Sequence, residues 1–342
     1  MQNLSRASRE LFRRTPDEIY PSLEALASHC RQHREISTDH WLSPKNLWAR
    51  PVSTERLVLA NGDDQSFFLN DWSFGQLCRL AGVTKETVNR LTSDTAARVF
   101  AETLPRGNKP LQVFATGEEA RSIHGASYTR LYNAELLDIV RDCAEGFEPP
   151  PKGFNGGTGL YCGEQDMFCF LIDPAGWTDI GGDSFAPGFF LWNSEVGRRS
   201  LGIETFWFQA VCQNHIVWDA VEVVEFSRKH TANIHDSLVE VRRIIQALAA
   251  KRDQRRDAFA RVIQRAMDTQ LGENADEVRA ALSKAGISRV LARQAIELAQ
   301  PQGRFTVFNM VDALTRLSRQ IVNAGDRTEV DQQAGNLLAL AV

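Results

Sequence analysis

The sequence lacks the marks of membrane-spanning, secreted and metal-binding proteins. No apolar run reaches the roughly 18 to 20 residues that span a bilayer, and no apolar stretch follows the basic N-terminus as in a secretory signal. The six cysteines include no Cys-x-x-Cys pair and no repeating spacing, a pattern typical of buried, reduced thiols. We therefore expect a cytoplasmic protein with no membrane partner, no metal site and no cofactor.

A net positive charge is also missing. The 342 residues carry a formal net charge of −4, so a nucleic-acid partner would have to bind a local basic surface. No internal repeat or low-complexity tract is present, and 43% hydrophobic with 24% charged residues is an ordinary globular composition. A chain of this length is expected to form about two or three lobes.

The character of the sequence changes along the chain, which predicts three regions. Residues 1–110 mix short helical and β-prone segments and predict an N-terminal α/β lobe. Residues 111–230 contain aromatic, β-prone runs bounded by Gly, Pro and Asp, which predict a central sheet domain, together with a helix over residues 133–143. Residues 231–342 are helical in pattern. We expect an α+β fold, with a central, mostly antiparallel sheet, packed helices and a C-terminal helical extension.

The most informative element for partners is one long helix, predicted over about residues 234–267. Between Arg228 and Arg265 lie ten Lys or Arg and four Asp or Glu, which makes this element basic on an acidic body. Such a strip can hold phosphates, and the candidate nucleic-acid-binding residues are Arg242, Arg243, Lys251, Arg252, Arg255 and Arg256. The alternatives are a solvated spacer helix with ordinary surface charge, or the seam of a homo-oligomer.

The same helix carries an apolar stripe. Its members are Leu238, Val241, Ile245, Leu248, Phe259, Val262 and Ala266. Arg252 and Arg255 interrupt the stripe, and a helix buried along its whole length would not place Arg there. We therefore expect both arginines on an exposed face.

A second candidate for DNA contact is the segment over residues 74–91. Two short helices, over residues 73–80 and 85–91, are predicted around a turn at Gly82, which is the helix-turn-helix pattern. The second helix would offer Thr84, Lys85, Thr87, Asn89 and Arg90 to a DNA groove. Helix pairs around a glycine turn are also common in proteins that never touch DNA.

Polar residues embedded between aromatic strands form a third candidate. Glu195, in the block Asn193-Ser194-Glu195-Val196-Gly197, and His215 have the chemistry of a general base and a metal ligand. The alternative is turn chemistry and buried hydrogen bonding. The glycine-rich residues 153–159 lack the Gly-Lys-Ser/Thr ending of a phosphate loop. Cys162 and Cys169 have no His or Asn partner at a recognisable spacing, so a nucleophilic cysteine is not predicted.

Several of these blocks resemble the domain-of-unknown-function 932 family, whose members are labelled phage/plasmid-like proteins. The resemblance covers about residues 65–335 and is carried by residues 127–133, 192–197, 211–218, 228–230 and 308–316. Asn193-Ser194-Glu195-Val196-Gly197 is the most specific block, whereas Asn214-His215 departs from the Asn-Gly that the family usually shows there. The resemblance implies an origin on phages, plasmids and integrated elements. It implies no reaction and no catalytic residues.

Together these patterns favour a protein of mobile elements that binds DNA or RNA and is not an enzyme. Binding or annealing of single strands in recombination is the leading hypothesis, with Trp192, Trp207 or Trp218 stacking on bases. One alternative is a metal-dependent hydrolase or nuclease built on Glu195 and His215. The other is a homo-oligomeric structural protein assembled along the long helix.

Overall fold

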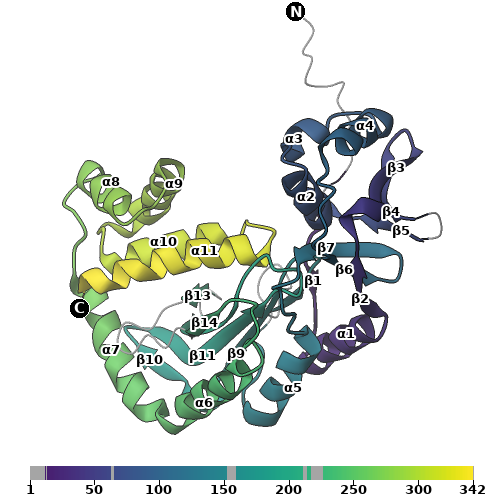
Figure 1. The fold of residues 1–342 in the computed structure, drawn as a ribbon. Helices are drawn as coiled ribbons and strands as arrows, with labels where there is room; N and C mark the ends of the chain where they lie inside the picture. The colour runs from purple at the N-terminus through teal and green to yellow at the C-terminus, as the bar shows by residue number, and fades with distance from the viewer. Residues whose placement is uncertain are drawn as a thin grey trace, which may run out of the picture.

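The computed structural model describes residues 12, 14–62, 65–151, 159–210, 214–216 and 226–341, with the backbone alone at 214–216. The fold is α+β, as predicted, and contains two β-sheets that lie end to end with helices packed on them (Figure 1). Among the described residues, no helix combines the length and the apolar character needed to cross a bilayer.

The larger sheet confirms the predicted central antiparallel sheet. Its described strands follow the order β1 (Glu18–Ile19), β8 (Leu160–Cys162), β9 (Met167–Ile172), β11 (Asp183–Asn193), β12 (Leu201–Gln209) and β13 (Asn214–Ile216), with β10 (Thr178–Ile180) beside β11 and β14 (Phe226–Arg228) beside β12. The pairs are antiparallel. Strands β9 and β12 are buried along their whole length. β9 is accordingly a continuous apolar run, because both faces of the sheet are covered.

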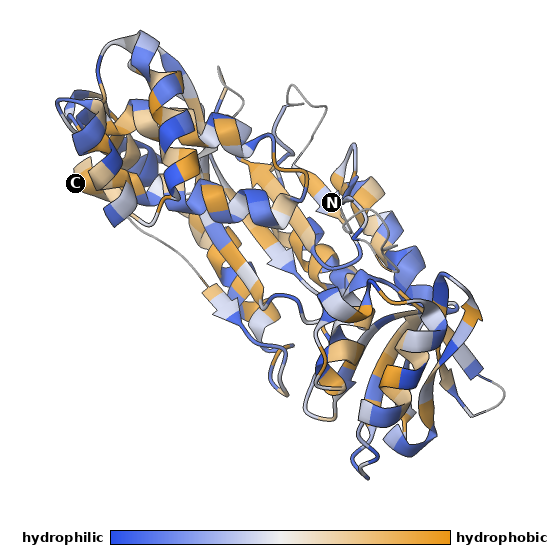
Figure 2. Cartoon of the chain, turned by 90° about the horizontal axis from the view of Figure 1, so that it is seen from above, coloured by the Kyte–Doolittle hydropathy of each residue, from blue (hydrophilic) through white to orange (hydrophobic). Residues whose placement is uncertain are grey.

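Helices cover both faces of this sheet (Figures 1 and 2). One face, with Phe189 and Ile203, packs against α1 (Leu23–Glu35), α5 (Asn133–Cys143) and α6 (Ser237–Ala250), and further along, at Trp207, against α7 (Arg252–Asp268). The other face, with Phe170 and Phe190, meets Ala324 of α11 (Ala324–Gly335). The C-terminal helices are completed by α8 (Ala275–Lys284), α9 (Arg289–Ala299), α10 (Val307–Ser318) and the 3₁₀ segment η5 (Asn336–Ala341).

The smaller sheet is mixed and has the order β2 (Ser37–Leu42), β6 (Leu111–Thr116), β7 (Glu119–Gly125), β5 (Gln65–Leu69), β4 (Arg56–Asn61) and β3 (Leu47–Ser53). Only the β5–β7 pair is parallel among its described pairs. Helices α2 (Asp71–Leu80), α3 (Lys85–Val88) and α4 (Ser93–Thr103) pack on it. Strands β6 and β7 lie beyond residue 110, so this sheet draws on the first two regions predicted from the sequence.

The prediction of one long helix over residues 234–267 is wrong. Helix α6 ends at Ala250 and α7 begins at Arg252, because Lys251 (φ −102°, ψ 16°) leaves the helical conformation. The apolar stripe itself is buried at Val241, Ile245, Leu248, Phe259, Val262 and Ala266. Its two halves, however, pack on different parts of the sheet, so the chain bends between them. The apolar stripe is thus covered by the chain's own sheet and C-terminal helices.

The second helix of the predicted helix-turn-helix pair is shorter than expected. Helix α3 ends at Val88 rather than at Leu91. Asn89 instead turns back to the N-terminal segment, where its side chain accepts a hydrogen bond from Phe12 N (2.8 Å) and donates one to Phe12 O (2.9 Å). One helical turn remains of the element that was expected to read a DNA groove.

The N-terminal segment is tied to the C-terminal helices. The Asp17 carboxylate accepts a hydrogen bond from Ala324 N at 2.9 Å, at the start of α11. Arg14 lies 4.0 Å from Asp326 and 4.0 Å from Asp166. Strand β1, which follows directly, pairs with β8. Residues 14–19 are therefore held by elements from the middle and the end of the chain.

Candidate functional site

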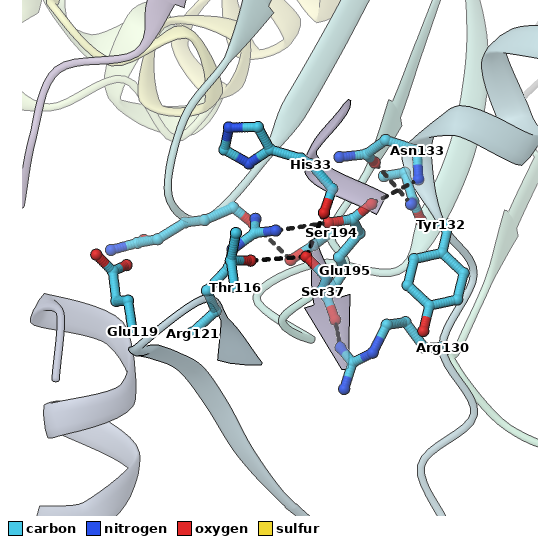
Figure 3. A network of polar contacts seen from close by, with 12 residues as sticks. His33, Ser37, Thr116, Glu119, Arg121, Arg130, Tyr132, Asn133, Ser194 and Glu195 are labelled. Atoms are coloured by element: carbon cyan, nitrogen blue, oxygen red, sulfur yellow. Dashed lines mark hydrogen bonds and ion pairs between the residues drawn. The ribbon is translucent and has the colours of Figure 1, made fainter. Parts of the chain in front are cut away.

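The two sheets meet at the turn after β11, here called the junction turn, which connects them through hydrogen bonds. This turn contains the Asn-Ser-Glu-Val-Gly block (Figure 3). Asn193 Nδ2 donates hydrogen bonds to Leu131 O and to Asn133 Oδ1, both at 2.9 Å. Ser194 Oγ donates to Gln165 O (2.6 Å) and accepts from Arg198 N (2.9 Å). Gly197 closes the turn with φ 72°, a conformation that favours glycine. These contacts match the turn and buried hydrogen-bond alternative.

Glu195 is fully engaged within the protein. Its Oε2 accepts a hydrogen bond from Arg121 Nη1 of β7 at 2.8 Å, and its Oε1 accepts one from Asn133 N, at the start of α5, also at 2.8 Å (Figure 3). The side chains of Arg121 and Glu195 are 9% and 5% exposed. The carboxylate thus links the two sheets and caps a helix N-terminus, where negative charge is favoured.

This arrangement gives the proposed metal chemistry no support. Within the described part of the chain, no group of three or more His, Cys, Asp or Glu is placed to hold a metal ion. The side chain of His215 lies outside the described residues, as do residues 152–158 of the glycine-rich stretch.

A stack of three rings lines the same junction. His124 of β7 stacks on Tyr128 (ring centroids 3.8 Å apart), and Tyr128 stacks on His230 (5.3 Å). His124 Nε2 lies 3.0 Å from Val196 O, and Tyr128 Oη donates to Glu195 O at 3.0 Å. Burial lowers the pKa of His124 and that of His230 to about 4 each, so both rings are neutral near pH 7.

On one side of the junction lies a hollow of about 260 Å³, here called the inter-sheet cavity. Residues from both sheets and from α1 line it, and most of the polar ones are titratable: Glu18, His29, Cys30, His33, Glu119, Arg121, Cys162, Glu164 and Glu195. His29 and His33, one turn apart on α1, have ring centroids 4.1 Å apart. The cavity therefore gathers two thiols, two imidazoles and three further carboxylates around the buried Arg121–Glu195 pair.

A second hollow of about 470 Å³, here called the Trp72 pocket, lies between α2, α3 and the junction turn. Its lining is Arg14, Asp71, Trp72, Gly75, Cys78, Arg79, Val83, Lys85, Gln165 and Arg198. The guanidinium carbons of Arg79 and Arg198 lie 5.5 and 5.9 Å from the centroid of the half-buried Trp72 ring. Trp72 is held by a 2.8 Å hydrogen bond from its Nε1 to Val196 O. Four cations and one carboxylate, that of Asp71, thus line a pocket that contains an aromatic ring.

A family model described as a domain of unknown function (DUF932) matches residues 121–320, which include the junction turn and most of the larger sheet. The chain belongs to the DUF932 family. Curated proteins and solved structures gave no match. The matched region begins at Arg121, the partner of Glu195, so both members of this buried pair belong to the DUF932 region.

The predicted basic strip of this DUF932 protein is largely neutralised. Arg242 pairs with Asp142 (3.4 Å), Arg243 with Glu240 (2.5 Å), Arg252 with Asp173, and Arg256 with Asp253 (3.0 Å). Lys251 is exposed at the break between α6 and α7. Contrary to expectation, Arg255 is only 6% exposed, because the helical repeat places it on the face of Phe259 and Val262.

The structure describes two of the three tryptophans proposed for base stacking, Trp192 and Trp207. Trp207 is fully buried and stacks on Phe259 with centroids 4.0 Å apart, so it cannot contact a base. Trp192 stacks on Phe190 at 5.0 Å, and Trp218 lies outside the described residues.

The sequence reasoning overlooked Trp72, Arg198 and the pairing of Cys162 with His29. The first two are separated by more than a hundred residues of chain, and His29 lies on a helix far from Cys162 in the sequence. No local spacing signals any of them. The Phe74–Leu91 segment, predicted for another reason, did point to one wall of the Trp72 pocket.

Proposed function

We propose that this DUF932 protein binds single-stranded nucleic acid, with the Trp72 pocket as its main contact. The observation that carries the proposal is the half-buried indole of Trp72 with the guanidinium groups of Arg79 and Arg198 close to it. Single strands bind to aromatic rings on which bases stack, beside cations that hold the backbone. Arg14 and Lys85 add positive charge to the same pocket.

The charge distribution supports this location over the α6–α7 strip. The chain as a whole carries −4, so attraction to phosphate has to be local. Along α6 and α7, Arg242, Arg243 and Arg256 face carboxylates at 2.5–3.4 Å. The described lining of the Trp72 pocket has a single carboxylate, that of Asp71, which pairs with Lys85 at 2.5 Å. Arg14 and Arg198 each lie 4.0 Å from Asp326, which is outside the lining, whereas Arg79 is exposed at the end of α2.

Such binding is the elementary step of strand annealing. We therefore propose a role in recombination on phages, plasmids or related mobile elements, in the cytoplasm, with DNA or RNA as the partner. The short helix α3, which forms one wall of the pocket, would then contact the strand through Lys85 rather than read a duplex groove.

Fluorescence anisotropy with labelled single-stranded DNA, single-stranded RNA and duplex DNA across a salt series tests this proposal. Arg79→Glu/Arg198→Glu is expected to weaken single-strand binding about tenfold or more and to reduce the salt slope, because each phosphate contact contributes about 0.7 to that slope. The matched control is Arg243→Glu/Arg256→Glu, which changes the net charge equally but lies on α6 and α7.

Trp72 provides a second arm of the same experiment. Trp72→Ala is expected to lose about 1–3 kcal/mol of binding free energy, whereas Trp72→Phe, which still offers a ring, retains most of it. Equal weakening by both charge-reversal variants would indicate a long-range field rather than this pocket. Absence of binding to every probe at low salt would overturn the proposed function.

A further inference from the structure

The inter-sheet cavity contains a second arrangement, independent of nucleic-acid binding. Cys162 comes from β8 and Cys30 from α1, and both side chains belong to the same buried cluster. Cys30 and Cys162 are 2% and 7% exposed, and the half-buried His29 precedes Cys30 on α1. Both cysteines and His29 line the cavity.

We propose that Cys162 and Cys30 form a thiol–disulfide exchange site for small disulfides, with Cys162 as the attacking thiolate and Cys30 as the resolving thiol. The geometry supplies the parts that such a site needs. It brings two thiols and an imidazole, from β8 and α1, to the wall of one cavity.

The electrostatics assign the two roles. Hydrogen bonds from the Cys30 thiol and from His29 lower the pKa of the Cys162 thiol. The pKa of Cys30 is raised, because its proton is held in the bond to Cys162 and because Cys30 is buried. The bond to Cys162 also raises the pKa of His29, so a thiolate–imidazolium pair is favoured.

Other charged groups also face this pair. His33 lies beside His29 on α1, Glu18 comes from β1, Glu119 and Arg121 from β7, Glu164 from the turn after β8, and Glu195 from the junction turn. Arg121 and Glu195 offset each other through their ion pair. The remaining carboxylates, those of Glu18, Glu119 and Glu164, leave the lining acidic. An acidic lining favours a cationic or neutral disulfide over an anionic one.

The reaction proceeds in two exchanges. The Cys162 thiolate attacks one sulfur of the small disulfide, whose S–S bond breaks; the leaving thiolate takes a proton from the His29 imidazolium. Cys30 then transfers its proton to His29 and attacks the Cys162 sulfur, and the mixed disulfide breaks. The second thiolate leaves and is protonated. One external disulfide is reduced to two thiols, while Cys30 and Cys162 are oxidised to one disulfide.

The test uses the full chain at pH 7 with cystamine, which is cationic, and dithiodiglycolate, an anionic disulfide of similar size. Alkylation followed by peptide mass spectrometry reports each cysteine. We expect a Cys30–Cys162 cross-link, formed faster with cystamine. Iodoacetamide is expected to label Cys162 at least about tenfold faster than Cys143, a half-buried thiol whose pKa burial raises, which serves as the control within the same chain.

Two variants separate the steps. Cys30→Ser is expected to stop at a stable mixed disulfide on Cys162, and Cys162→Ser to leave Cys30 unreacted. Labelling of Cys162 no faster than that of Cys143 in the unmodified chain would overturn the proposal without any variant having to fold. A mixed disulfide on Cys162 that never resolves to Cys30 would overturn it as well. Equal rates with the two disulfides would overturn the assignment of a cationic or neutral substrate.

Discussion

Glu195 illustrates at the residue scale how a polar block acts as structure. Replacing it with Ala removes the partner of Arg121 and the acceptor of Asn133 N, both buried at the junction. Glu195→Ala is therefore expected to lower the free energy of unfolding by about 3–5 kcal/mol, since a buried charge is left unpaired. Urea denaturation followed by circular dichroism measures the change.

The matched control for that prediction is Glu240→Ala on α6. Glu240 also pairs with an arginine, Arg243, but on the solvent-exposed surface, where such a pair contributes little to stability. If Glu195→Ala were as stable as the unchanged protein, the carboxylate would not be structural, and the metal-dependent hydrolase hypothesis would regain weight.

Residues that meet from distant parts of the chain were the ones that sequence reasoning missed. Cys162 was set aside because no His stands at a recognisable spacing, yet the fold brings His29 of α1 to it. The six arginine and lysine candidates were chosen for their density on one segment. Two of their carboxylate partners, Asp142 and Asp173, come from other elements. Local patterns contain no information about these pairings.

At the scale of elements, the junction turn depends on Gly197. Its φ of 72° strains any other residue, and a Cβ atom there would lie 2.7 Å from His124 Cε1. Gly197→Ala is expected to cost about 1–3 kcal/mol of backbone strain and an additional amount for the contact. Thermal and urea unfolding measure the loss.

Gly117→Ala separates the two causes. Gly117, in the β6–β7 hairpin, has φ 56°, but a Cβ atom added to it would meet nothing within 4 Å, so its replacement reports backbone strain alone. Gly197→Ala should therefore be the more destabilising of the two. Equal losses would show that His124 moves aside without cost.

Elements with a clear local signal were predicted well. The helix expected over residues 133–143 matches α5, because its apolar positions Leu136, Leu137 and Val140 fall on one face. The helix over residues 234–267 was not predicted correctly, because neither Gly nor Pro marks the break at Lys251. The break follows from packing on two parts of one sheet, which local patterns do not encode.

At the scale of the whole molecule, the ring stack predicts how stability depends on pH. The unfolded chain has histidine pKa values near 6.5, whereas burial lowers those of His124 and His230 to about 4. Between these values the unfolded state binds more protons than the folded state. The stability contributed by each ring is thus present above about pH 6.5 and lost as the pH falls towards 4, by up to about 3 kcal/mol.

The comparison is made between the unchanged protein and His124→Gln, by urea unfolding at several pH values. Burial raises the pKa values of Asp166 and Asp331 to about 6 and about 7, so these carboxyl groups add stability as the pH falls. Because both proteins contain them, their contribution cancels in the difference between the two unfolding free energies. The unchanged protein is expected to lose stability relative to His124→Gln as the pH falls from 6.5 to 4. A difference that does not vary with pH would contradict the assignment of His124 as a buried neutral ring.

The tie between residues 14–17 and α11 has a consequence for biosynthesis. Arg14 lines the Trp72 pocket and Thr15 lines the inter-sheet cavity, and Asp17 is held by Ala324. The ribosome makes Asp17 307 residues before Ala324. Neither hollow is therefore walled as described until α11 has left the exit tunnel, so a chain terminated before α11 would be released with both sites unfinished.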